Sequence, residues 1–182
     1  MRVIAGKFKG RTLKSPSWEG LRPTSDRLRE TLFNILAPRM EGARVLDGYA
    51  GTGAIGIEAL SRGAVSVTFI ESDRRAQALV TENLSRCGIS GGYAIIRASV
   101  VRALATLKTG SDRFDLIVFD PPYDAVADDE VAAAGELLAS GGLLVLEHAR
   151  RRSTPETVGA LRRTREVRSG DSGLAFYEHH GA

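Results

Sequence analysis

Short apolar runs alternate along most of the chain with longer segments whose apolar residues recur every three or four positions. The short runs are typical of buried strands, and the longer segments are typical of amphipathic helices. Strands that alternate with helices favour a doubly wound, mostly parallel α/β sheet with helices on both faces. The expected strands are 44–47, 65–71, 93–97, 114–120 and 143–147, and the expected helices are 54–62, 73–87, 100–107 and 129–138.

The C-terminal part departs from this alternation. Segments 161–168 and 174–179 flank the turn sequence Ser-Gly-Asp-Ser-Gly with no helix between them. Adjacent strands joined by a short glycine-containing turn form an antiparallel hairpin. We therefore expect seven strands in the sheet, with an antiparallel hairpin at one edge.

The N-terminal part also departs from it. Apolar and basic residues flank a glycine-containing turn at 6–10, which predicts a short β-hairpin. A helix is expected over 25–37, where Pro38 ends the apolar periodicity. We interpret residues 1–23 as a basic hairpin arm and residues 24–182 as the main domain.

Composition limits the number of domains and the cellular locations that are compatible with the chain. A chain of 182 residues is long enough for one domain with a substantial core. Its single cysteine, Cys87, rules out an intramolecular disulfide and a cysteine-based zinc site, so we expect a reducing, cytoplasmic location and no metal. No apolar run is long enough to span a bilayer, and residues 1–6 lack the sustained apolar core of a signal peptide, so no membrane association is expected.

Charge is distributed unevenly along the chain. The net charge is +3, but residues 1–29 hold eight Lys or Arg against two acids, and residues 111–147 hold nine acids against one Arg. A basic arm beside a more acidic body is typical of proteins that bind a polyanion, of which nucleic acid is the commonest.

A glycine-rich loop follows the first strand of the sheet. Gly51, Gly53 and Gly56 match the G-x-G-x-x-G pattern between a strand and a helix, where the backbone approaches a bound ligand. Asp47 ends the preceding strand and Glu71 ends the following one. A carboxylate at the position of Glu71 can accept hydrogen bonds from both ribose hydroxyls. The spacing predicts a cofactor that contains adenosine.

Asp47 distinguishes between two cofactors that contain adenosine, NAD and S-adenosylmethionine. The pyrophosphate of a dinucleotide requires backbone N–H groups and disfavours a nearby carboxylate. S-adenosylmethionine carries a sulfonium and an ammonium group, which a carboxylate attracts. Asp47 therefore favours S-adenosylmethionine over NAD.

A second candidate site follows the strand 114–120. Proline lacks an N–H and restricts the residue before it, so Asp120-Pro121-Pro122-Tyr123 ends the strand abruptly. In a doubly wound sheet this turn projects into the crevice that also holds the glycine loop. The tetrapeptide resembles the [DNS]-P-P-[YFW] motif of amino-methyltransferases, which act on exocyclic amines of adenine, guanine or glutamine. Together with the glycine loop, it resembles the Rossmann-like S-adenosylmethionine-dependent methyltransferases.

The chemistry of this reaction explains the residue types. The lone pair of an exocyclic amine is delocalised into the base, so the site must orient the amine and stabilise the positive charge that develops on it. The Asp120 carboxylate and the Pro121 carbonyl can accept its two N–H groups, and the two prolines, Pro121 and Pro122, keep both acceptors rigid. Tyr123 offers a face on which the extruded base can stack, a contact worth roughly 1–3 kcal/mol.

Five segments extend the resemblance to nearly the whole chain. Segments 2–16, 21–36, 44–64, 114–123 and 141–150 resemble the RsmD family, bacterial 16S ribosomal RNA guanine-N2-methyltransferases that act on assembled small subunits. This resemblance implies a Rossmann-like methyltransferase sheet, S-adenosylmethionine as cofactor, S-adenosylhomocysteine as product, and 16S ribosomal RNA in the small subunit as partner; no obligate protein partner is expected. It implies these cofactor-binding residues: Asp47, Tyr49, Gly51, Gly53, Glu71, Ser72 and Ser99. It implies these RNA-binding residues: Arg2, Lys7, Lys9, Arg11, Arg22, Arg27 and Arg29.

The chain differs from the family in the first glycine loop and after the third strand. Tyr49 replaces a usual phenylalanine, which is a mild change. Ser99 stands where most members place an acid that meets the adenine amine, and a serine can still accept that hydrogen bond. Thr24, in the segment that resembles the family's arm, is also explained as a helix cap.

Three other functions are compatible with parts of the sequence. A DNA adenine-N6 methyltransferase shares the tetrapeptide but usually carries an added target-recognition domain, for which this chain has little room. An NAD-dependent dehydrogenase requires the glycine loop but leaves Asp120–Tyr123 unexplained. A non-enzymatic RNA-binding module explains the basic arm and leaves the cofactor loop without a role.

Overall fold

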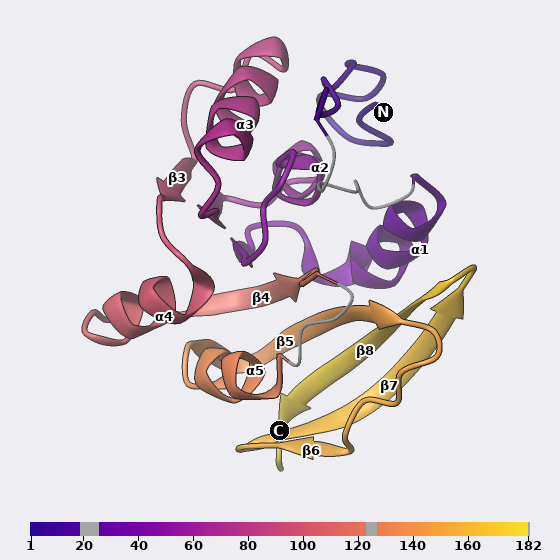
Figure 1. Cartoon of the computed structure of the whole chain (residues 1–182), viewed down its shortest axis with the longest axis vertical. Coiled ribbons are helices and arrows are strands. Elements are labelled where there is room, and N and C mark those ends of the chain that lie inside the picture. The colour runs from indigo at the N-terminus through magenta and orange to yellow at the C-terminus, as the bar shows by residue number, and fades with distance from the viewer. Residues whose placement is uncertain (19–25, 123–126, 182) are drawn as a thin grey trace.

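The structure is a computed structural model that describes residues 1–18, 26–122 and 127–181. Its centre is one twisted sheet with helices on both faces, and the chain ends lie far apart in Figure 1. The strand order is β3-β2-β1-β4-β5-β8-β7-β6. Strands β1 to β5 pair in parallel, and the pairs from β5 to β6 are antiparallel. The expected doubly wound, mostly parallel sheet is therefore confirmed.

The elements lie within a few residues of their expected positions, apart from β5. The parallel strands are β1 (Arg44–Asp47), β2 (Ser66–Ile70), β3 (Tyr93–Ile96), β4 (Phe114–Phe119) and β5 (Leu138–Ala149). The remaining strands are β6 (Thr157–Val158), β7 (Leu161–Ser169) and β8 (Ser172–His179). The helices are α1 (Asp26–Leu36), the 3-10 turn η1 (Ala37–Arg39), α2 (Ala54–Ser61), α3 (Arg74–Arg86), α4 (Val100–Lys108) and α5 (Asp128–Gly135).

Two expectations about the strands were wrong. The sheet has eight strands in the described residues, because Thr157 and Val158 add a two-residue edge strand that is too short to leave a pattern in the sequence. Strand β5 begins at Leu138 and runs through Gly141 and Gly142, which we expected to precede it. A register shift against β4, between Phe114 and Leu116, accommodates the extra residues.

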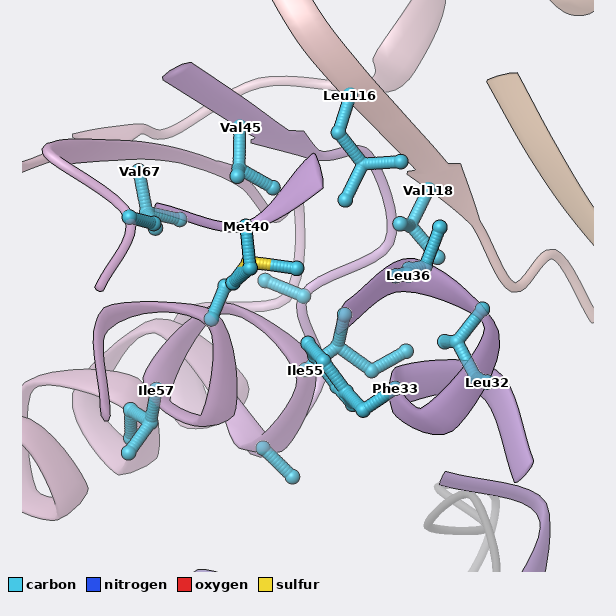
Figure 2. Packing of buried hydrophobic residues seen from close by; sticks show 14 of the residues in the cluster. Leu32, Phe33, Leu36, Met40, Val45, Ile55, Ile57, Val67, Leu116 and Val118 are labelled. Atoms are coloured by element: carbon cyan, nitrogen blue, oxygen red, sulfur yellow. The ribbon is translucent and has the colours of Figure 1, made fainter. Parts of the chain in front are cut away.

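Two apolar layers cover the sheet. Helices α1, α2 and α3 pack on one face through a single buried cluster, in which Figure 2 shows Leu36 of α1 beside Val118 of β4. Helices α4 and α5 cover the other face through a second cluster. Both faces of the central strands are thus buried, as their continuous apolar runs predict.

The N-terminal segment folds back on itself and packs against the domain. Arg2 and Thr12 form an antiparallel bridge, and the Val3 N–H donates to the Arg11 carbonyl at 3.0 Å. Val3 and Leu13 are 1% and 2% exposed and belong to the same core as α1. The predicted hairpin is present as one bridge with supporting turns, and apolar side chains fix it to the domain. The expected arm boundary at residue 23 lies outside the described residues.

The order of the strands also positions a crevice. After β1 the chain adds β2 and β3 on one side, and then returns to place β4 on the other side of β1. The connections on either side of this switch point diverge, which leaves space beyond the carboxyl ends of β1 and β4. In the described part of the chain, no helix has the length and apolar character needed to cross a membrane.

Candidate active site

Four carboxylates line the carboxyl edge of the sheet. Glu71 follows β2, Asp47 ends β1, Asp120 follows β4, and Glu147 lies near the end of β5. Strands β2, β1, β4 and β5 are adjacent and parallel, so the four acids stand side by side in that order. Their charges interact, because Asp120 and Glu71 act on Asp47, and Asp120 acts on Glu147. Among the residues described, no group of three or more His, Cys, Asp or Glu could hold a metal ion.

The glycine loop fixes the Glu71 carboxylate. Gly51 and Gly53 have φ angles of 54° and 76°, the left-handed region that favours glycine. Their turn directs the Gly51 N–H to Glu71 Oε2 at 2.8 Å, while the Asp73 N–H donates to Oε1 at 2.8 Å. Glu71 is half-buried, and two backbone donors therefore hold its carboxylate at the edge of the crevice.

The third glycine of the pattern serves packing. A Cβ on Gly56 would lie 2.2 Å from the ring of Phe69, so only glycine lets α2 approach β2 this closely. The Gly56 N–H donates to Asp47 Oδ2 at 3.0 Å. The glycine pattern thus combines a ligand-facing turn with close contact between helix and strand, as in nucleotide-binding folds.

Asp47 is buried in a way that favours a cationic ligand. Its side chain is 2% exposed. Burial, with the added charges of Asp120 and Glu71, raises the pKa of Asp47 to about 7, although the Gly56 hydrogen bond opposes the rise. A positive group nearby would stabilise the ionised carboxylate and lower its pKa again. The site therefore fits the sulfonium and ammonium groups expected from the sequence.

A cavity of about 160 Å³ lies beside the carboxyl ends of β1 and β2. Predicted residues Tyr49, Glu71, Ser72 and Ser99 line it, together with apolar Ile70 and Val100 and other neighbours. Apolar walls with a few polar groups are typical of sites for small planar ligands. The structure therefore brings four of the seven predicted cofactor-binding residues to one cavity.

Two of these residues also have structural roles. The ring of Tyr49 packs edge-on against Phe119, with centroids 5.6 Å apart, and burial raises the pKa of its hydroxyl to about 12. Ser99 is exposed and caps α4, because its Oγ accepts the Arg102 N–H at 3.5 Å. The capping role was not expected, although a serine directly before a helical pattern is a common signal for it.

The residues after β4 lie at the same edge. Asp120 and Pro121 are half-buried, and Pro122 is exposed. Both prolines line a narrow hollow together with Glu147 and Arg152. Tyr123 lies outside the described residues, so its stacking role stays a prediction.

Glu147 was not among the predicted site residues. Its side chain is 6% exposed, forms a hydrogen bond with Asp120, and accepts the Ser172 Oγ–H at 3.0 Å. Burial, followed by the charge of Asp120, raises the pKa of Glu147 to about 8. The signal in the sequence was an acid at the end of a buried apolar run, the same signal that identified Asp47.

The predicted RNA-binding residues differ in their exposure. Arg2, Lys7, Lys9 and Arg27 are exposed on the arm and on the first turn of α1. Arg11 is also exposed, but its guanidinium donates to the Cys87 carbonyl at the end of α3. Arg22 lies outside the described residues.

The prediction that Arg29 binds RNA was wrong, because this residue is buried. Its side chain is 0% exposed, and Nη2 donates to the Arg2 carbonyl at 2.6 Å and to Asp26 Oδ1 at 3.0 Å. Burial lowers its pKa, an effect that Asp26 and Glu58 oppose. Arg29 precedes Phe33 by one helical turn and therefore lies on the buried face of α1, where it holds the arm and does not face solvent.

A buried acid completes the attachment of the arm. Glu58 on α2 is 0% exposed and accepts the N–H groups of Ile4 at 2.8 Å and Ala5 at 3.0 Å. It also accepts Arg62 Nε at 2.7 Å. Because breaking a buried charge network is costly, the arm is held firmly against the domain.

Comparisons with known proteins agree with this geometry. The model of a family described as "Conserved hypothetical protein 95" matches residues 1–178. The chain is 37% identical to the YlbH protein of Bacillus subtilis, over 100% of both chains. It is 42% identical to the "Ribosomal RNA small subunit methyltransferase D" of Escherichia coli, over 68% of this chain and 60% of that protein.

Solved structures show the same architecture. The yhhF protein of Escherichia coli superimposes with a TM-score of 0.84 at 32% identity, over 100% of this chain and 99% of that one. A chain from Haemophilus influenzae, HI0767, superimposes with a TM-score of 0.77 at 31% identity, over 98% and 97%. The likeness therefore extends over the arm, the sheet and the C-terminal hairpin.

Proposed function

Because the chain belongs to the RsmD family of methyltransferases, we propose that it methylates 16S ribosomal RNA with S-adenosylmethionine as the methyl donor. We assign the exocyclic N2 amine of a guanine as the acceptor and the assembled 30S subunit as the substrate, with S-adenosylhomocysteine as the product. One observation carries the proposal. Asp120 and Pro121 leave β4 at the topological switch point, next to the buried Asp47 and on the same edge as the cavity that Glu71 lines.

The cavity supports a site for the adenosine part of the cofactor. The Glu71 oxygens, held by two backbone amides, are positioned to accept the ribose hydroxyls. Ile70 and Val100 provide apolar walls for the adenine ring, and the Ser99 hydroxyl at the rim can accept a hydrogen bond from the adenine amine. A serine accepts this bond more weakly than a carboxylate does. Cofactor affinity in this chain therefore depends strongly on Glu71 and on the groups that hold the tail.

Asp47 and the glycine loop suit the amino-acid part of the cofactor. The bound cofactor supplies an electrophilic methyl group on a sulfonium. The Asp47 carboxylate, buried and next to other acids, provides a negative potential for the positive charges of that part. Gly51 and Gly53 present backbone without side chains at the same place, which allows close approach.

Asp120 and Pro121 act on the acceptor amine. Their oxygens accept its two N–H groups and turn the nitrogen lone pair toward the methyl group for in-line attack. The Asp120 carboxylate also stabilises the positive charge that develops on nitrogen. A methylated ammonium-like nitrogen is acidic, so it loses its proton without a strong base. Tyr123 is proposed to stack on the extruded base.

The basic arm provides electrostatic attraction for RNA. Arg2, Lys7, Lys9 and Arg27 are exposed, and the arm that carries three of them is fixed to the domain through Glu58. Lys and Arg contacts to phosphates position a nucleic acid without reading its sequence. We therefore assign these residues to orientation of the RNA, and selection of the base to the crevice.

Methyl transfer to defined substrates tests the proposal. The purified chain is incubated with labelled S-adenosylmethionine and with small subunits lacking the modification, naked 16S ribosomal RNA, or DNA, and the modified base is mapped. We expect incorporation at the N2 of one guanine in the subunits, with Asp120→Ala as the inactive control. Label in DNA would favour an adenine-N6 enzyme, and absence of transfer to every substrate would refute the proposal.

A further inference from the structure

Glu147 lies beside the proposed catalytic carboxylate. Phe119 of β4 pairs with Leu146 of β5, so the next residues, Asp120 and Glu147, occupy neighbouring positions at the edge of the sheet. The two side chains are hydrogen-bonded to one another. Glu147 is 6% exposed, whereas Asp120 is half-buried. Two carboxyl groups this close are stable only if they share a proton.

A second partner comes from the antiparallel part of the sheet. Ser172 at the start of β8 pairs with Ala149, and its Oγ–H donates to Glu147 Oε1 at 3.0 Å. This bond occupies Oε1 and fixes the rotamer of the glutamate. Oε2 then remains for a proton directed at Asp120.

We propose that Glu147 is a positioning residue that keeps its proton at neutral pH and donates it to the Asp120 carboxylate, which fixes Asp120 for contact with the acceptor amine. The inference rests on the proposed role of Asp120. It adds a donor from β5 that no sequence motif of the site contains.

The environment determines which of the two acids holds the proton. Burial of Glu147 and the charge of Asp120 both raise the pKa of Glu147, which reaches about 8. The other groups around the pair are Asp47 from β1, whose charge interacts with that of Asp120, and Arg152 and Asp128, which line the same hollow, while Ser172 from β8 is neutral. His148 is turned toward Glu166 of β7, with Nε2 and Oε1 3.5 Å apart. The proton therefore stays on the more buried acid.

This arrangement predicts an alkaline loss of activity. Above pH 8 Glu147 loses its proton, and a donor to Asp120 becomes a second negative charge. A carboxylate next to Asp120 repels it and releases its rotamer. The turnover number should then fall about tenfold for each further pH unit, as expected when one protonated group is essential.

The experiment compares Glu147→Gln with Glu147→Ala. Glutamine keeps an N–H donor but does not titrate, so Glu147→Gln should retain activity at pH 7 within about threefold and lose the alkaline fall. Glu147→Ala removes the donor and should lower kcat at least about tenfold at every pH, with cofactor affinity unchanged. If the alkaline fall came from titration of the RNA or of the cofactor, it would also be seen in Glu147→Gln. An alkaline fall of equal size in Glu147→Gln, or its absence in the unmodified protein, would overturn the proposal.

A measurement without RNA separates this inference from the proposed function. Carbon NMR of protein labelled at the glutamate side-chain carboxyl follows the titration of Glu147 directly, and its signal is identified by its loss in Glu147→Gln. We expect a midpoint near pH 8. A midpoint at the ordinary value for glutamate would refute the retained proton even if methyl transfer occurs. Absent transfer with a midpoint near pH 8 would refute the function and keep the hydrogen-bonded pair.

Discussion

Replacement of Asp47 by asparagine should change how the stability of the protein depends on pH. Asp47 is 2% exposed, and its pKa rises from 3.8 to about 7, mainly through burial. The folded state thus binds a proton that the unfolded state has lost between these pH values. Stability from this group is complete below pH 3.8, declines as pH rises, and is lost above pH 7.

The magnitude follows from the pKa difference. A tenfold change in an equilibrium constant is worth about 1.4 kcal/mol, so the whole effect is on the order of 4 kcal/mol. Between about pH 5 and pH 8, the free energy of unfolding should decline by roughly 3 kcal/mol because of Asp47 alone. Asparagine keeps an oxygen for the Gly56 N–H and carries no titratable group. The Asp47→Asn protein should therefore lack this decline. The decline in stability that the raised pKa of Glu147 causes should remain.

Urea unfolding without cofactor at both pH values measures the difference. Asp112→Asn, which alters an exposed carboxyl, is the matched control and should follow the unmodified protein. Cofactor affinity, measured by calorimetry at pH 8, should fall sharply in Asp47→Asn because the carboxylate that faces the cationic tail is gone. An equal decline in stability for Asp47→Asn and the unmodified protein would show that burial does not perturb Asp47. The electrostatic reason for choosing this cofactor would then be wrong.

Three further changes test other parts of the site. Asp120→Ala should abolish methyl transfer and alter cofactor affinity by less than about threefold, and a joint loss in transfer and binding assays would place Asp120 on the cofactor. Lys7→Ala combined with Lys9→Ala should weaken RNA binding and reduce the salt slope by about two in filter binding, whereas Lys108→Ala on α4 should not. An unchanged slope would exclude the arm from the RNA interface. Gly56→Ala places a Cβ 2.2 Å from a buried phenylalanine ring of β2 and should cost about 1–3 kcal/mol in urea unfolding, and no cost would mean that the ring moves aside.

The order of elements could be predicted from local pattern because the parallel strands are rich in apolar residues and a helix with its own apolar periodicity or capping signals connects each pair of them. Both signals are local in the sequence and do not depend on partners. The eighth strand could not be predicted in this way, since Thr157 and Val158 are a strand only through pairing with β7. The same holds for the extended start of β5, which depends on a register shift against β4.

In the candidate site, too, some features could be predicted from local sequence and others depend on the fold. Asp47, Glu71 and Asp120 could be placed together because parallel strands bring their carboxyl ends to one edge, so acids at strand ends must meet there. The exposure of the arginines could not be assigned without the fold. Arg29 resembles its neighbours in the sequence, yet the face of α1 on which it lies is the one that packs against the domain.

Local patterns were therefore sufficient to predict the parallel part of the sheet, the crevice and three of the four acids at its edge, because periodicity and strand order are properties of consecutive residues. Folding brings Glu147 into contact with Asp120 and Ser172, and it places Arg29 and Glu58 where they secure the arm. These contacts join residues from different elements. The protonation and the exposure of a charged group are set by such neighbours, which no local pattern specifies.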